Sequence, residues 1–124
     1  MAKIPDEELK KAFSELHNKV VSTRQLLKVA DMQIENINRH NLRVSLTRSE
    51  LKQLPENTKT YESVGRMFLL QDMNTIMEDL DKRTKLADGK IKALNNQKTY
   101  LQKDLKESED NIREMVQKRQ KQDS

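Results

Sequence analysis

The chain has 124 residues, the size of one domain, but charged residues make up 35% of it and aromatic residues only 3%, which excludes an ordinary globule with a thick core. Its 24 basic and 20 acidic residues are typical of a solvated helix surface rather than of a nucleic-acid footprint. The absence of cysteine excludes disulfides and thiolate metal sites, and no apolar stretch is long enough for a membrane span or a signal peptide. We therefore expect a cytoplasmic protein without a nucleic-acid or membrane partner.

The first predicted element is a long helix over residues 1–46. The acidic run after Pro5 suits a helix start, because proline is tolerated in the first turn and carboxylates favour the N-terminal end of the helix dipole. From Leu9 onward, seam positions recur at alternating spacings of four and three, the a/d pattern of a coiled coil. These positions are Leu9, Phe13, Leu16, Val20, Thr23, Leu27, Ala30, Ile34, Ile37, Asn41 and Val44.

Residues 47–71 are predicted to form a short helix followed by a β-hairpin. Thr47 and Glu50 have the spacing of a capping box, which indicates a short helix over about residues 47–53, and Pro55 is expected to end it. "TYESV" and "MFLL" have strand character, and Gly65-Arg66 between them fits a two-residue type II′ turn with a positive φ at glycine. In the alternative interpretation, "VGRMFLLQD" simply begins the second helix.

The last predicted element, over residues 72–124, is a second coiled-coil helix with a basic tail. Asp72 is a plausible N-cap, and Gly89, at an outward position, is expected to weaken the helix by about 1 kcal/mol relative to alanine. Polar seam residues such as Lys98 commonly fix register, and the lysine stem can lie along the seam while its ammonium group reaches water. The seam positions are Met73, Met77, Leu80, Thr84, Ala87, Ile91, Leu94, Lys98, Leu101, Leu105, Ser108, Ile112 and Met115.

These elements predict a mainly α protein of one domain, in which the two helices form an antiparallel coiled coil. Heptads alone do not set orientation, so a parallel homodimer is the alternative; the turn chemistry between the helices favours the intrachain pair. A two-stranded ribbon is marginal in water, so the hairpin is expected to assemble with hairpins of other subunits into an inter-subunit β-barrel. The predicted oligomerisation residues are Tyr61, Val64, Gly65, Met67, Phe68, Leu69 and Leu70.

Four segments, "DEELKKAFSELHNKV", "LKVADMQIENINR", "YESVGRMFLLQD" and "EDNIREMVQKRQ", closely resemble β-type subunits of the prefoldin family. The similarity covers nearly the whole chain. It implies a heterohexamer of two α-type and four β-type subunits, with a β-barrel platform and protruding coiled coils. It also implies an ATP-independent chaperone that holds non-native actin and tubulin chains at the coiled-coil tips and delivers them to the cytosolic chaperonin, without cofactor or metal.

On this interpretation the client-binding residues lie where the two helix ends meet. Side chains near a frayed coiled-coil end are only partly covered, and flexible methionine suits poorly defined apolar clients. We call these residues the helix-end set: Leu9, Phe13, Leu16, Ile112, Met115 and Val116. The alternative is that they are ordinary coiled-coil core.

No pattern in the sequence indicates an enzyme. His17 and His40 are far apart on the first helix and are expected at the surface, without metal-ligand spacing nearby. There is neither a Gly-rich phosphate loop nor a nucleophile motif. A generic coiled-coil scaffold without client binding remains the alternative function.

Overall fold

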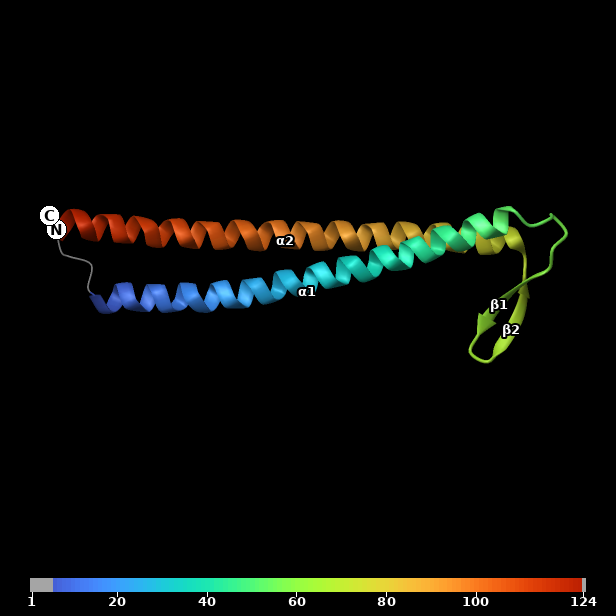
Figure 1. Ribbon diagram of the computed structural model, residues 1–124, viewed down its shortest axis with the longest axis horizontal. Coiled ribbons are helices and arrows are strands. Elements are labelled where there is room, and N and C mark those ends of the chain that lie inside the picture. The colour runs from blue at the N-terminus through green and yellow to red at the C-terminus, as the bar shows by residue number, and fades with distance from the viewer. Residues whose placement is uncertain (1–5, 124) are drawn as a thin grey trace. The chain divides into compact units, whose positions relative to one another are not determined.

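The computed structural model describes residues 6–123 and the side chains of residues 6–122. Its elements, labelled in Figure 1, are α1 (Asp6–Lys52), β1 (Thr60–Val64), β2 (Met67–Gln71) and α2 (Met73–Asp123). The chain divides into two compact units, unit 1 (Met1–Met32 and Leu94–Ser124) and unit 2 (Gln33–Ala93). Each unit contains a part of α1 and a part of α2.

In unit 1, the two helices run side by side in opposite directions (Figure 1). Cross-helix ion pairs demonstrate this order: Asp6 pairs with Arg119, and Lys19 Nζ lies 2.9 Å from Asp104 Oδ2. The start of α1 therefore lies beside the end of α2 within the same chain, and the predicted intrachain antiparallel pair is confirmed. Pro5 lies outside the described residues, while the acidic residues after it occupy the first turn of α1 as expected.

The predicted seam is confirmed in both units. Every predicted seam position except Phe13 is buried or half-buried, and the outward positions between them are mostly exposed. Ala30 in unit 1 and Ala87 in unit 2 are among the most buried apolar residues, because a small side chain lets the opposing helix approach closely. The core of each unit is therefore one narrow seam, as the low aromatic content indicates.

The prediction of a separate short helix over residues 47–53 is wrong, because α1 continues unbroken to Lys52. Thr47 lies inside it, and its Oγ1 donates a hydrogen bond of 2.9 Å to the carbonyl oxygen of Arg43 one turn earlier. A threonine hydroxyl can bond the preceding turn in this way instead of capping a new helix. The first long helix thus ends at residue 52 rather than at residue 46.

Pro55 does end the helix, as predicted. The amides of Gln53 and Leu54 donate 3.2 Å hydrogen bonds to carbonyls three residues earlier, a tightened last turn that often closes a helix. A reverse turn follows, in which Thr58 N donates to Pro55 O at 3.0 Å. The chain then enters β1.

β1 and β2 form the predicted antiparallel hairpin, in the register Val64↔Met67 to Thr60↔Gln71. Gly65 has a φ of 62°, and no described residue other than glycine has a positive φ, as in a type II′ turn and unlike type I′. The alternative in which this segment begins the second helix is wrong. α2 starts at Met73, and the carbonyl of Asp72 accepts the first helical hydrogen bond from Ile76 N at 3.1 Å, the geometry of an N-cap.

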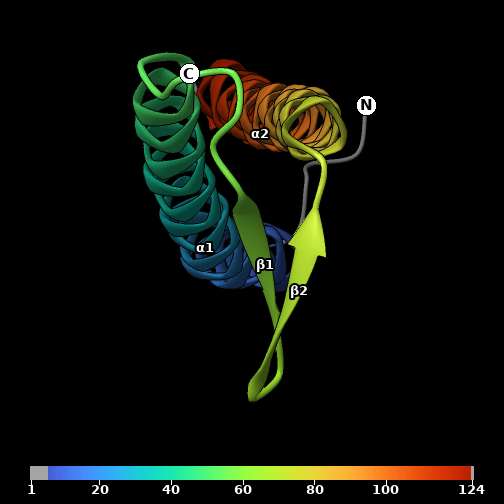
Figure 2. The same cartoon turned by 90° about the vertical axis from the view of Figure 1, so that its right-hand side faces the viewer.

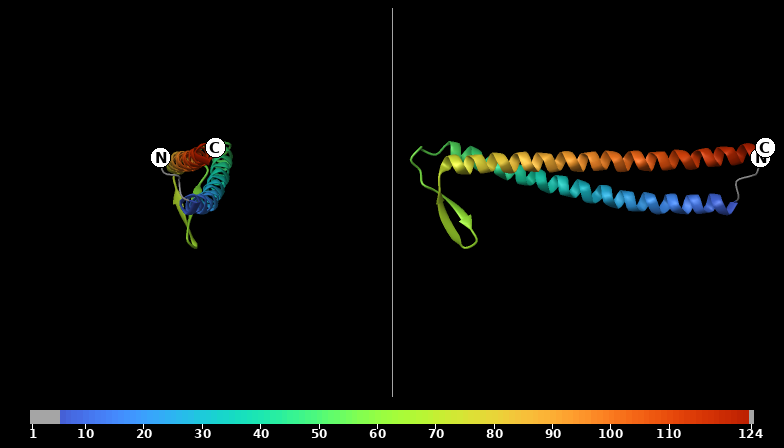
Figure 3. Two further views of the ribbon diagram at one scale, coloured as in Figure 1. Left: turned by 90° about the vertical axis from the view of Figure 1, so that its left-hand side faces the viewer. Right: turned by 180° about the vertical axis from the view of Figure 1, so that it is seen from behind.

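The hairpin projects away from the helical part of unit 2, and its two strands twist about each other toward the turn (Figures 2 and 3). Its far end is not covered by either helix of that unit. At its base, the Oγ1 of Thr60 donates a 2.6 Å hydrogen bond to the carbonyl of Gln71, so the strands are tied together where they leave the helices.

Candidate functional site

The hairpin exposes most of its apolar side chains. Phe68 is 73% exposed, and the large apolar residues on both sides of it along β2 are also exposed. Alternation along the strands places Phe68 and Leu70 on one face with Tyr61, and Met67 and Leu69 on the opposite face with Val64. Both faces of this ribbon are therefore apolar and open.

All seven predicted oligomerisation residues lie on this hairpin, six in its strands and Gly65 in its turn. The sheet has two strands, so the outer edge of each strand is unpaired within the described chain. Unpaired edges offer backbone donors and acceptors to a further strand. The structure thus brings together apolar faces and free edges, the two features that strand-to-strand assembly requires.

Contacts with α2 anchor the base of the hairpin. Glu62 Oε1 lies 3.8 Å from a guanidinium nitrogen of Arg83, and both side chains are partly exposed. Tyr61 and Ser63 line a recess of about 210 Å³ together with Ile76 and Leu80 of α2. The sequence did not reveal the Glu62–Arg83 contact, because both residues look like ordinary solvated charges.

The helix-end set lies in unit 1, on the parts of α1 and α2 that run beside each other. Leu16 and Ile112 line one shallow groove of about 280 Å³ between the helices. Leu9, Met115 and Val116 are half-buried, whereas Phe13 is 46% exposed. The structure therefore places Leu16 and Ile112 at the same groove and leaves Phe13 exposed on the surface of α1.

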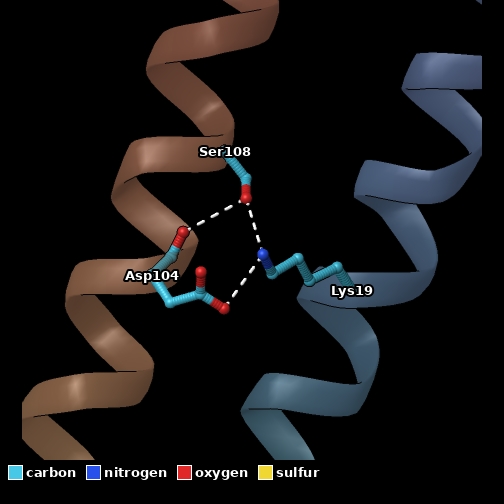
Figure 4. Close-up of polar contacts among 3 residues, drawn as sticks. All are labelled: Lys19, Asp104 and Ser108. Carbon is cyan, nitrogen blue, oxygen red and sulfur yellow. Dashed lines mark hydrogen bonds and ion pairs between the residues drawn. The ribbon is translucent and has the colours of Figure 1, made fainter.

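Lys19 and Ser108, which also line this groove, form a polar cluster with Asp104 (Figure 4). Lys19 Nζ donates a 2.7 Å hydrogen bond to Ser108 Oγ and lies 2.9 Å from Asp104 Oδ2, while Ser108 Oγ donates to the carbonyl of Asp104 at 3.1 Å. The heptad pattern marks Ser108 as a polar seam residue but does not single out Lys19 and Asp104, which lie just outside the a/d positions. The cluster gives the helices of unit 1 a specific polar register.

A comparable set of contacts crosses the helices in unit 2. Asn41 Nδ2 donates a 3.2 Å hydrogen bond to Asp88 Oδ1, and Arg48 pairs with Asp81. Asn41 Oδ1 and Arg48 Nε are nevertheless buried without a hydrogen-bond partner. Unpaired polar atoms of this kind lower the stability of the fold, a loss that is expected where a polar residue in the seam specifies the register.

The two histidines lie far apart on α1, His17 in unit 1 and His40 in unit 2. His17 is exposed, and His40 is half-buried at the surface, where it lines a groove beside α2. Among residues 6–123, no group of three or more His, Cys, Asp or Glu residues is placed to hold a metal ion. No helix within these residues combines the length and the hydropathy needed to cross a bilayer.

Two antiparallel helices in each unit, with an open apolar hairpin between α1 and α2, define a coiled-coil protein of the prefoldin type. The family model described as "Prefoldin subunit" matches residues 7–119. Prefoldin subunit 1 from Danio rerio is 48% identical over 122 residues, which are 98% of this chain and 100% of the relative. Prefoldin subunit 1 from Homo sapiens has the same identity and coverage, and a probable prefoldin subunit 1 from Caenorhabditis elegans is 42% identical over 92% of this chain and 97% of its own.

The prefoldin beta subunit from Thermococcus strain KS-1 has a similar solved structure. Its TM-score is 0.72 at 20% sequence identity, and the match covers 92% of this chain and 96% of that one. At 20% identity, this structural similarity shows that the two chains share a fold. Together with the family match and the relatives of nearly equal length, it establishes that the chain belongs to the prefoldin subunit family, whose members are chaperone subunits that assemble with one another.

Proposed function

We propose that the chain is a β-type subunit of a cytoplasmic prefoldin heterohexamer, which holds two α-type and four β-type subunits. The complex captures non-native chains such as actin and tubulin without ATP and delivers them to the cytosolic chaperonin. The observation that carries this proposal is the exposed apolar hairpin of unit 2. Family membership supports the rest.

The hairpin is the proposed assembly module, with the neighbouring subunits' hairpins completing a β-barrel. A two-stranded ribbon is at best marginally stable in water, and clustered exposed apolar side chains mark interaction sites. Pairing its free edges with other strands satisfies the backbone groups and covers both apolar faces at once. The alternative function, a passive coiled-coil scaffold, does not account for an exposed apolar hairpin.

A serine substitution tests assembly. Phe68→Ser on the hairpin should weaken complex formation with the other prefoldin subunits at least tenfold, measured by sizing and light scattering. The matched control is Tyr100→Ser, since Tyr100 on α2 is 69% exposed, close to the 73% of Phe68. The hairpin's role would be contradicted if Phe68→Ser and Tyr100→Ser weakened assembly equally, or if neither weakened it.

The helix-end set is the proposed client site. Five of its residues are only partly covered and Phe13 is exposed, so a slight separation of the helices presents a broader apolar surface to an unfolded chain. Several subunits that grip one client add avidity through effective concentration, which compensates for weak individual contacts. Met115 adds an adaptable side chain to this surface.

The client site is tested in the assembled complex. Phe13→Ser combined with Met115→Ser should leave the complex intact and reduce its suppression of the aggregation of denatured actin severalfold. Val29→Ser is the control, because Val29 lies on α1 in unit 1 and is 43% exposed, close to the 46% of Phe13. Transfer of labelled actin from the complex to purified chaperonin tests delivery. Intact assembly without any client binding would favour the scaffold alternative.

A further inference from the structure

A second groove lies in unit 2, apart from the hairpin strands and the helix-end set. It has a volume of about 310 Å³ and runs between α1 and α2. Ile37 and His40 line it from α1, and Arg83, Leu86 and Lys90 line it from α2. The proposed assembly and client-binding functions do not require this groove.

The charges of α2 are divided between the two sides of its seam in unit 2. Asp81 and Asp88 are seven residues apart and face Arg48 and Asn41 of α1. Arg83 and Lys90, also seven residues apart, lie on the other side of the seam, because a seven-residue step preserves the helix face. On the acidic side Asp81 is paired with a cation and Asp88 with an amide of the same chain, whereas the groove side is cationic.

No carboxylate lines this groove. Arg83 has only the 3.8 Å contact with Glu62, between two partly exposed side chains, and Lys90 Nζ has no ion pair among the described residues. Across from these cations α1 supplies His40 and Asn36, neither of which is an acid. The groove thus presents positive charge that nothing in unit 2 neutralises fully.

The groove is also apolar. Leu86 at its rim is 65% exposed, and Ile37 and Ala87 form part of its lining. Leu86 lies between the two cations, three residues after Arg83 and four before Lys90. The combination suits a ligand that has both carboxylates and a bulky apolar side chain.

We propose that this groove binds a short acidic segment of a partner protein, with carboxylates on Arg83 and Lys90 and an apolar side chain against Leu86. Charge complementarity supports this occupant. A nucleic acid fits less well, because no Phe, Tyr or Trp of the described residues lines the groove to stack on a base.

The test uses the complex assembled from the full chain and its prefoldin partners. The probe is a fluorescein-labelled peptide of alternating Glu and Leu, with an alternating Gln and Leu peptide and a single-stranded DNA oligonucleotide as comparisons. Arg83→Glu with Lys90→Glu should weaken binding of the acidic peptide at least tenfold in fluorescence anisotropy. Lys85→Glu with Lys92→Glu is the matched control: the change in charge, the helix and the seven-residue spacing are the same, but the residues are exposed outside the groove.

A single Lys90→Glu variant leaves the Glu62–Arg83 contact intact and should still weaken binding about threefold, so the result does not depend on an unperturbed hairpin. Leu86→Ser should weaken it as well, without a change in charge. Equal losses in the two double variants, absence of binding to the native complex, or stronger groove-dependent binding of the oligonucleotide would each overturn the proposal. Because all variants retain Phe68 and Phe13, failure here is distinguishable from failure of the proposed assembly and client sites.

Discussion

The ammonium nitrogen of Lys98 lies 2.5 Å from Asp31 Oδ1 on the opposing helix of unit 1. Lys98 holds a seam position and its side chain is 26% exposed, whereas that of Asp31 is 59% exposed. The lysine stem lies in the seam and its charged end reaches a carboxylate at the edge. A charge is thus tolerated in the seam because its partner stays near water.

Replacing this lysine should stabilise the chain. In Lys98→Leu an apolar side chain fills the seam position and no charge needs to be kept near water, so we expect the free energy of unfolding to rise by about 1 kcal/mol. The measurement is urea denaturation of the assembled complex, followed by far-UV circular dichroism. Asp31→Asn is the control, with a loss below about 1 kcal/mol that shrinks as salt is added, since the pair is partly solvated. A less stable Lys98→Leu variant would show that the ion pair outweighs apolar burial.

Gly89→Ala should also stabilise α2. A Cβ at residue 89 meets nothing within 4 Å, and the glycine has an ordinary helical φ. The helical propensity difference predicts a gain of about 1 kcal/mol. The thermal midpoint should rise by a few degrees without a change in assembly. If stability rises but client capture falls, flexibility at Gly89 has a functional role.

The same substitution at the other glycine should have the opposite effect. Gly65 has a φ of +62° in the hairpin turn, so Gly65→Ala forces an L side chain into the left-handed region although space is available for it. We expect a cost of about 1–2 kcal/mol in hairpin formation, seen as weaker assembly with partner subunits. Gly65→Asn should be milder, because asparagine adopts this conformation more readily. Unchanged assembly of Gly65→Ala would show that the turn geometry is not limiting.

Thr47→Ala tests whether Thr47 lies inside a continuous α1, as the structure shows, or caps a separate short helix, as the sequence pattern indicated. Thr47 lies inside α1 and bonds the carbonyl of Arg43, so alanine should change the free energy of unfolding by less than about 0.5 kcal/mol, or raise it. Loss of an N-cap residue costs about 1 kcal/mol where its side chain bonds the first turn. Asp72 caps α2 through its backbone carbonyl, so Asp72→Ala should cost at most about that amount. Denaturation curves of the two variants provide the comparison. A larger loss for Thr47→Ala would favour a helix break near residue 47.

Much of the local structure could be read from spacing alone. The four-three alternation predicted the buried seam at all positions but Phe13, because each helix buries one narrow face whatever its exact partner. Gly65-Arg66 predicted the turn, since only a few residue types accept its backbone angles. The capping-box spacing gave a wrong helix start because the Thr47 hydroxyl can either cap a new helix or bond the preceding turn. Which of the two bonds forms depends on whether α1 continues past residue 47.

The candidate sites were only partly predictable. The oligomerisation and helix-end residues were named from pattern and resemblance, and the structure shows how exposed each of them is. The partners of Lys19, Arg83 and Lys98 could not be named, because exposed charges follow no periodic rule. The heptad positions do place Asp81 and Asp88 on the opposite side of the seam from Arg83 and Lys90, but they do not say which residues of α1 face each side.

Periodicity and turn chemistry by themselves determined the helices, the seam and the hairpin, because each depends on residues close together in the chain. The cross-helix partners and the cationic groove of unit 2 depend on which residues of α1 meet which residues of α2. Those pairings join segments about 30 to 110 residues apart. Only the tertiary structure decides them, since many registers satisfy the same heptad pattern and the polar contacts select one.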